Sequence, residues 1–213
     1  MQGDLQDPLI DRYQIRNGTW TVAQQRTFAI VIVALLCISE GARSETFSVN
    51  ASDSRSLIEF RIRQFGIFSI SGRFERFRGK LTLDGRRAMA SQVRIDIDAA
   101  SVNSSFPARD RYLRGKAVLA SRNYPKITFR STSTKVTGRY SVLVTGKMTF
   151  REITRPVSFH VRYVVGTNRN GRGSRKHFIG SGSFKLSDFG VTGIPTLLSD
   201  RVFLTFRLAL RPT

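Results

Sequence analysis

The chain has 213 residues, of which 40% are hydrophobic and 23% are charged, and its formal net charge is +20. This composition suits one globular domain with a sizeable core, and it excludes a disordered or fibrous chain. The 16 Phe residues outnumber 5 Tyr and 1 Trp, so most of the aromatic surface has no polar group and belongs away from water. The excess of Arg and Lys predicts either an acidic partner or a solvated basic surface with no partner.

The first feature along the chain is an uncharged apolar run over 28–38, which follows Arg26 and precedes a small and polar stretch. This run is too short to span a bilayer, and it matches the apolar region of a secretory signal. We therefore expect residues 1–43 to be a leader with a signal peptide, cleaved after Gly41, and the protein to be periplasmic or secreted. Translation from Val22 would leave a more compact basic leader. A buried strand or a retained anchor is the alternative interpretation.

Side chains suited to chemistry are few. The single cysteine, Cys37, lies inside the apolar run, so the segment from 44 to 213 has no thiol. His160 and His177 lack neighbouring Cys or clustered carboxylates, which leaves too few ligands for a metal site. Nucleophile elbows and phosphate-binding loops are also absent from the sequence. We predict no enzyme activity, no metal and no cofactor.

From Ser44 onward, apolar and polar residues alternate with a period of two, as is typical of half-buried strands. In 92–98, for example, Val93, Ile95 and Ile97 share one face, and Arg or Asp residues occupy the other. Turn residues such as Asp84 and Gly85 separate the runs. The predicted strands, in chain order, are 46–49, 56–62, 68–77, 79–83, 92–98, 126–131, 140–150, 156–163, 177–186 and 201–210.

One helix is predicted, from about Pro107 to Leu119, with Ser105 as a possible cap. Its apolar positions are too sparse for a bundle helix, so we expect it to cover one mouth of the strand structure. An all-antiparallel sheet removes its edges by closing into a barrel. An eight-stranded barrel is wide enough to be filled by its own side chains or to enclose one small ligand. Periodicity alone favours the filled core.

Five stretches in this order resemble the YceI-like family of polyisoprenoid-binding proteins. The stretches are Ile58–Leu81, Val93–Gly115, Tyr124–Thr132, Val144–Val161 and Gly182–Phe206. The resemblance covers nearly all of 44–213, and it implies an exported, antiparallel, eight-stranded lipocalin-like barrel with one short helix near a barrel rim. It also implies that a long isoprenoid tail is threaded through the core. We therefore expect 44–213 to be a YceI-like lipid-binding β-barrel.

The expected cavity lining combines the inward faces of the strands with positions that the resemblance implies. It comprises Phe60, Ile62, Phe74, Val93, Ile95, Ile97, Leu113, Phe129, Val144, Phe159, Val161, Phe189, Leu204 and Phe206. The resemblance places Leu113 in the rim helix with Arg109 and Asp110, and Phe189 in a loop at the opening. Two positions depart from the family pattern, because Leu186 replaces an Arg and Gln64 replaces a His. These departures leave the lipid head group open.

The predicted function is that of an exported protein that sequesters or carries an apolar isoprenoid-type lipid, such as a quinone or a polyprenyl chain. The alternative is a basic peripheral module that docks to an anionic membrane or another polyanion and has a ligand-free core. Nucleic acid is disfavoured as a partner because the chain carries an export signal. The oligomeric state is left open, a homodimer included.

Overall fold

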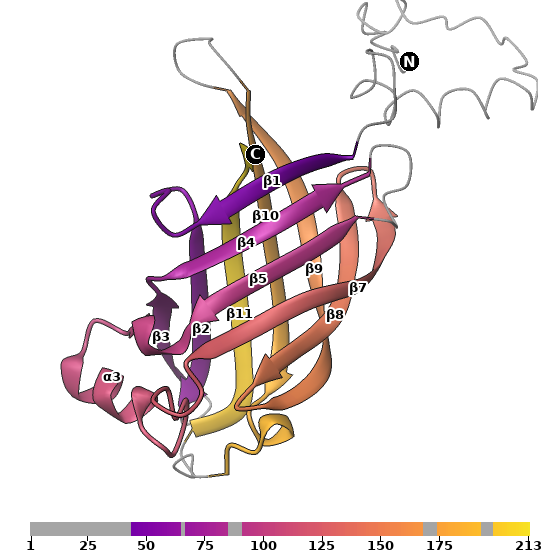
Figure 1. Cartoon of the computed structure of the whole chain (residues 1–213). Helices are drawn as coiled ribbons and strands as arrows, with labels where there is room; N and C mark the ends of the chain where they lie inside the picture. The colour runs from indigo at the N-terminus through magenta and orange to yellow at the C-terminus, as the bar shows by residue number, and fades with distance from the viewer. Residues whose placement is uncertain (1–43, 65–66, 85–90, 168–173, 193–197) are drawn as a thin grey trace, which may run out of the picture. The chain divides into compact units, whose positions relative to one another are not determined.

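The computed structural model describes residues 44–64, 67–84, 91–167, 174–192 and 198–213, so the predicted leader over 1–43 lies outside the described residues. The described strands form a single 12-stranded sheet in the order β12-β1-β4-β5-β7-β8-β9-β10-β11-β2-β3-β6. Every pair of neighbours in this sheet is antiparallel. Figure 1 shows the sheet strongly curled, with β4 and β5 facing β10 and β11 across the interior. The strands are β1 Glu45–Asn50, β2 Leu57–Gln64, β3 Phe68–Phe74, β4 Phe77–Leu83, β5 Gln92–Asp98, β6 Val102–Asn103, β7 Lys126–Gly138, β8 Ser141–Phe150, β9 Ile153–Thr167, β10 Ser174–Lys185, β11 Leu198–Ala209 and β12 Arg211–Pro212.

The period-two pattern of the sequence reappears as alternating burial. In β2, Ile58, Phe60 and Ile62 are buried, whereas Glu59 and Arg61 are exposed. All ten predicted strands are present, and the expectation of an all-antiparallel β protein is confirmed. The two-residue strands β6 and β12 were not predicted, because two residues are too few to show a period.

The expected closed barrel of eight strands is wrong, since the described sheet is curled but open, with β12 and β6 at its two edges, and contains twelve strands. The physical reason is that several long runs of extended chain bend and break into two strands each. The breaks lie at 51–56, 75–76, 99–101 and 210. They lie beside one another in space: the Ala51 N–H donates to the Phe77 carbonyl at 3.1 Å, and the Glu75 N–H donates to the Ser101 carbonyl at 3.0 Å. A sheet that curls this tightly bends along one line across neighbouring strands.

Asp53 joins the first of these bends to the C-terminal strand. Its side chain is 3% exposed and accepts a hydrogen bond from Arg55 Nε at 2.7 Å and from Arg211 Nε at 3.2 Å. The hydrogen bond from Arg55 holds the pKa of this carboxyl well below its usual range, although burial acts in the opposite direction. Ser56 adds a second link, because its Oγ accepts the Ala209 N–H at 3.0 Å. Together these contacts hold β1 against the end of the β11–β12 run.

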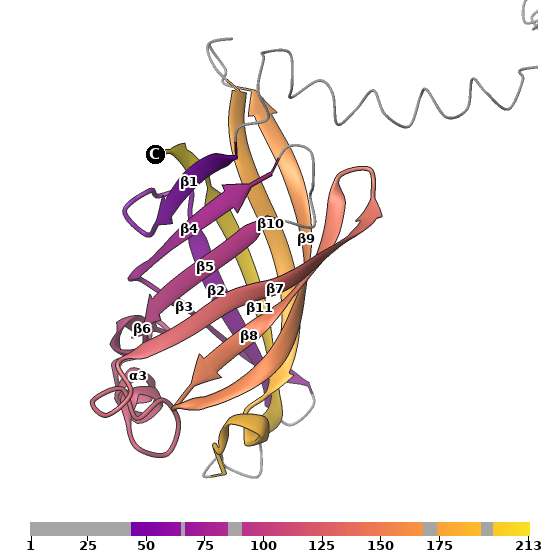
Figure 2. The ribbon, with the colours of Figure 1, turned by 45° about the vertical axis from the view of Figure 1, so that its right-hand side comes forward.

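Helix α3, Pro107–Arg114, is the one α-helix among the described residues, and it lies beside β6 at one end of the curled sheet (Figure 2). It is shorter than the predicted 107–119 because its last turn ends at Gly115, whose N–H donates to the Tyr112 carbonyl at 3.0 Å. The Arg114 guanidinium ties the helix to the sheet by donating to the carbonyls of Ala100 at 2.8 Å and Val102 at 2.6 Å.

The N-terminal end of α3 differs from the expected Ser105 cap. The residue at the cap position is Phe106, and no side chain caps the first turn. Instead, the buried Asp110 carboxylate accepts the Ser104 N–H at 2.8 Å and the Ser104 hydroxyl at 2.5 Å. The carboxylate therefore fixes the loop that leads into the helix.

Candidate functional site

The inner face of the curled sheet brings the expected lining residues together. All of them belong to one hydrophobic core or pack against it. The buried members are Phe60, Ile62, Phe74, Ile95, Ile97, Leu113, Val144, Phe159, Val161, Phe189 and Leu204, and the partly buried ones are Val93, Phe129 and Phe206. Period-two reasoning therefore identified the apolar face of the strands that supply these residues, whereas Leu113 and Phe189 were named from the resemblance.

Several inward aromatic rings pack closely over glycines of the neighbouring strand. A Cβ added at Gly72 would lie 2.5 Å from Phe60 Cζ, and one added at Gly182 would lie 2.5 Å from Phe159 Cδ1. In the sheet register, the directly opposed pairs are Phe60 with Gly72, Phe159 with Gly182, and Phe206 with Gly180. Because glycine has no side chain, each ring can pack directly over the backbone of the neighbouring strand.

A row of rings crosses the inner face from β7 to β11. The ring centroids of Phe129 and Phe159 are 5.2 Å apart, and those of Phe159 and Phe206 are 5.8 Å apart, both in edge-to-face geometry. Such contacts stabilise aromatic pairs beyond simple burial. Phe129 and Phe206 nonetheless remain only partly buried, although both face inward. This row is an apolar surface that keeps some accessible area on the inner side of the sheet.

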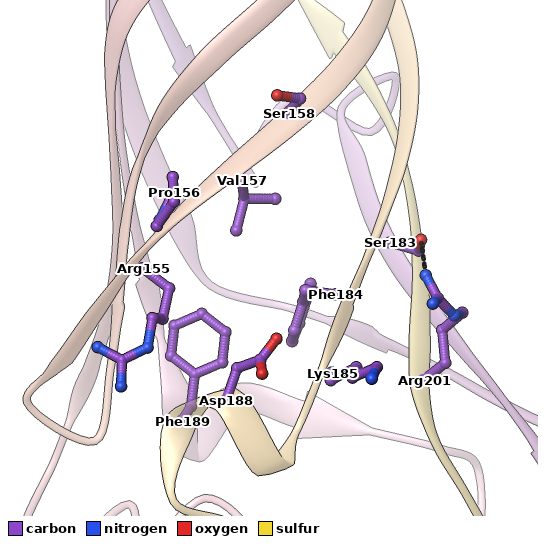
Figure 3. Close-up of a pocket in the computed structure, with 10 residues that line it drawn as sticks. All are labelled: Arg155, Pro156, Val157, Ser158, Ser183, Phe184, Lys185, Asp188, Phe189 and Arg201. Carbon is purple, nitrogen blue, oxygen red and sulfur yellow. Dashed lines mark hydrogen bonds between the residues drawn. The ribbon is translucent and has the colours of Figure 1, made fainter.

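A recess of about 330 Å³ lies at the end of the sheet where β9 and β10 separate (Figure 3). The pairing of these strands ends at Phe159 opposite Gly182. Beyond that point, within the described residues, β9 remains paired with β8, and β10 remains paired with β11. The 3₁₀ helix η3, Ser187–Phe189, follows β10 at this place. We call this feature the β9–β10 recess; its lining residues are Arg155, Pro156, Val157, Ser158, Ser183, Phe184, Lys185, Asp188, Phe189 and Arg201.

The floor of the β9–β10 recess is apolar. Phe189 is 1% exposed, and its ring packs edge-on against Phe184 with centroids 5.5 Å apart. Val157 is also buried and belongs to the same hydrophobic core. The resemblance predicted that Phe189 lies in a loop at the opening of the barrel. In the structure, Phe189 lies at the inner side of the β9–β10 recess. The floor therefore joins the recess to the core.

The rim of the β9–β10 recess carries three cations and one carboxylate. Arg155 comes from β9, whereas Lys185 of β10 and Arg201 of β11 are directly opposed in the sheet register. Arg201 Nη1 donates to Ser183 Oγ at 3.0 Å, as the dashed line in Figure 3 shows. Asp188 of η3 is the carboxylate of the lining. Sequence reasoning missed these cations, because only the strand register brings Lys185 and Arg201 together.

Asp200 anchors η3 beside the recess rather than lining it. Its carboxylate accepts the Ser187 N–H at 2.8 Å and the Ser187 hydroxyl at 2.5 Å. Burial acts to raise the pKa of Asp200, but the bonds from Ser187 and the charge of Lys185 outweigh burial and lower it. The carboxylate is thus held ionised at the base of η3.

The two departures from the family pattern occupy different surroundings. Leu186 is 5% exposed and packs in the hydrophobic core, so an apolar contact stands where the family usually has a cation. Gln64 is half-buried at the end of β2, opposite Phe68 and Leu198. Neither residue lines the β9–β10 recess.

Other kinds of site receive no support from the part of the chain that the structure describes. Within the described ranges, His, Cys, Asp and Glu side chains do not gather in a group of three or more that could hold a metal ion. None of the helices in those ranges is both long and apolar enough to cross a membrane. The candidate sites are therefore the apolar inner face and the β9–β10 recess.

Comparison with known proteins connects this geometry to a family. A family model described as the YceI-like domain matches residues 47–210. A UPF0312 protein of Yersinia pestis (strain Pestoides F) is 32% identical over 160 residues, which cover 75% of this chain and 82% of that protein. A UPF0312 protein of Pseudomonas paraeruginosa is 31% identical over 163 residues, with coverage of 76% and 85%.

Solved structures share the same fold. BcnA of Burkholderia cenocepacia superposes with a TM-score of 0.65 at 25% identity, over 73% of this chain and 96% of that one. A polyisoprenoid binding domain from Saccharophagus degradans superposes with a TM-score of 0.57 over 80% of this chain and 100% of that one. At 15% identity, the second likeness shows the fold alone. The curled sheet with its short helix is therefore the lipocalin-like fold of these proteins.

Proposed function

Because the chain belongs to the YceI-like family, we propose that it carries the tail of an isoprenoid-type lipid, such as a quinone or a polyprenyl chain, against the inner face of its curled sheet. The observation that carries this proposal is the set of inward Phe rings that pack over glycines of the neighbouring strands and line the wall with apolar surface. The description of the Saccharophagus degradans structure as a polyisoprenoid binding domain supports the same ligand class.

Burial of the tail supplies enough free energy for binding. Each buried methylene group contributes about 0.8 kcal/mol, so roughly ten such groups contribute about 8 kcal/mol before the cost of association. The edge-to-face row of Phe129, Phe159 and Phe206 offers aromatic surface for these contacts. No reaction with the lipid is required for this affinity.

The proposal includes export and the absence of catalysis. The apolar run over 28–38 supports a signal peptide and a periplasmic or secreted protein. The expected lining is composed of Phe, Ile, Leu and Val side chains, none of which can transfer a proton. A carrier needs nothing more from its interior.

The test is the lipid content of the purified protein, measured by organic extraction and mass spectrometry. Phe206 faces inward and Phe203, on the same strand, is 38% exposed and faces outward. We expect Phe206→Asp to abolish the co-purified lipid and Phe203→Asp to keep it. A second variant, Val142→Trp, adds apolar volume to the inner face and should also lower lipid content while the protein stays folded by circular dichroism. Native protein that yields no lipid and binds none when supplied would overturn the proposal.

A second candidate function, docking on an anionic membrane, is favoured by exposed apolar residues beside cations. Ile67 is 84% exposed and Phe68 is 65% exposed where β3 begins. On the neighbouring outer face, the Arg63 guanidinium lies 5.9 Å from the centroid of the Phe203 ring. Exposed apolar side chains with adjacent cations suit an interface with acidic lipid head groups.

This candidate is tested by sedimentation with vesicles that contain anionic phosphatidylglycerol. Ile67→Asp should reduce binding, whereas Val136→Asp, at a residue that is 58% exposed in β7, should not. Binding should weaken as salt rises. Equal binding of the two variants, or no binding by the unmodified protein, would contradict membrane docking through Ile67 and Phe68.

A further inference from the structure

We propose that the β9–β10 recess binds the phosphate or diphosphate head group of the lipid that the inner face carries. This inference rests on the proposed carrier function and assigns a chemical class to the head group. The ligand would lie with its tail toward the core and its phosphate at the rim of the recess.

The first argument is the position of the recess in the wall. Since β9 and β10 stop pairing at Phe159 and Gly182, the sheet is interrupted laterally at this place. The inner side of the interruption is formed by Val157 and Phe189, which both belong to the hydrophobic core. A molecule with an apolar tail and a polar end can therefore contact the core and the rim of the recess at once.

The second argument is the charge of the rim. Arg155, Lys185 and Arg201 exceed the single carboxylate of Asp188 by two positive charges. Ser158 and Ser183 add hydroxyl groups to the lining. Charge-assisted hydrogen bonds from Arg and Lys are the usual means by which proteins hold phosphate oxygens. A doubly charged phosphate ester matches this excess of charge.

Asp188 fits the same ligand. Figure 3 shows its carboxylate in the recess between Phe189 and Lys185. A carboxylate accepts hydrogen bonds, so it can receive one from a protonated phosphate oxygen or from a hydroxyl group of the head. Asp200, the other nearby carboxylate, is already engaged by Ser187.

A cationic pair by itself does not define such a site, and the chain contains a matched comparison. Lys80 of β4 and Arg94 of β5 are directly opposed in register, as Lys185 and Arg201 are, and both are exposed. Lys80 and Arg94 do not line the β9–β10 recess. What distinguishes Lys185 and Arg201 is the recess with an apolar floor beside them.

The experiment is calorimetric titration of the delipidated protein with farnesol, farnesyl phosphate and inorganic phosphate. We expect farnesyl phosphate to bind about tenfold or more tightly than farnesol, and this advantage to shrink at high salt. Lys185→Gln with Arg201→Gln should remove the advantage and leave farnesol binding unchanged. Lys80→Gln with Arg94→Gln should retain it.

Each other outcome has a distinct meaning. If the protein binds farnesol and farnesyl phosphate equally, or if the recess variant keeps the advantage, the head-group assignment is overturned and the carrier function stands. If inorganic phosphate binds as tightly as farnesyl phosphate, the recess is a site for free phosphate and the assignment is again overturned. If neither prenyl compound binds, the carrier function itself fails and the head-group assignment fails with it.

Discussion

Replacing Gly72 by Ala tests whether the inward rings lie on glycines as the structure shows. An added Cβ would lie 2.5 Å from Phe60 Cζ and 2.7 Å from Phe60 Cε1, closer than unstrained atoms approach. The carbonyl oxygen of Asn103 would lie 2.9 Å away. The Phe60 ring must therefore move off the wall, and its contact with Phe74, at 5.8 Å between centroids, must change.

The expected magnitude follows from overpacking. Forcing an extra methyl group into a well-packed site typically costs about 1–3 kcal/mol of the free energy of unfolding. Phe60→Leu alone removes part of a ring that is 7% exposed, which costs about 1–2 kcal/mol. In the double variant, the shorter Leu relieves much of the clash with the new methyl group. The two changes should therefore cost less together than the sum of their separate costs, by about 1 kcal/mol.

The assay is denaturant unfolding of the four proteins of this double-mutant cycle, followed by circular dichroism. The control cycle combines Phe60→Leu with Gly182→Ala, whose added Cβ would meet Phe159 rather than Phe60. We expect coupling in the first cycle and additivity in the second. Additivity in the Gly72 cycle would refute the idea that Phe60 lies on this glycine.

Three further predictions concern the contacts that hold the bends, the helix and η3. Asp53→Asn should destabilise the protein by about 2 kcal/mol at pH 7. Because the pKa of Asp53 is lowered in the folded state, its contribution is complete above about pH 4 and is lost as the pH falls toward the folded pKa, so the difference in stability between the two proteins should shrink progressively from about pH 4 to about pH 2. Asp110→Ala should remove the acceptor of the buried Ser104 N–H and hydroxyl and cost about 1–3 kcal/mol in thermal or denaturant unfolding. Arg111→Ala, at an exposed position of α3, should cost less than about 0.5 kcal/mol. Ser187→Ala should cost about 1 kcal/mol by loss of its bond to Asp200; an unchanged midpoint would show that this bond does not hold η3.

The alternation of apolar and polar residues was sufficient to locate ten of the twelve described strands and to assign the apolar face of several of them. Successive side chains of a strand point to opposite sides, so each run such as Val93, Ile95 and Ile97 carries its own orientation in the sequence. For the same reason, the expected lining residues converge on one core. The extent of α3 was less well predicted, because a helix of eight residues with few apolar positions has a weak period.

What the sequence by itself determined is therefore the local part of the structure: which residues form strands, which side of each strand is apolar, and the order of motifs that marks the family. Only the tertiary structure decided the number of strands, since the aligned bends at 51–56 and 75–76 arise from the curvature of the whole sheet. The tertiary structure also created the β9–β10 recess, where Lys185 of β10 and Arg201 of β11 are directly opposed on paired strands. Contacts of this kind depend on strand register and on where pairing stops, and both are set by packing among segments that are distant in the chain.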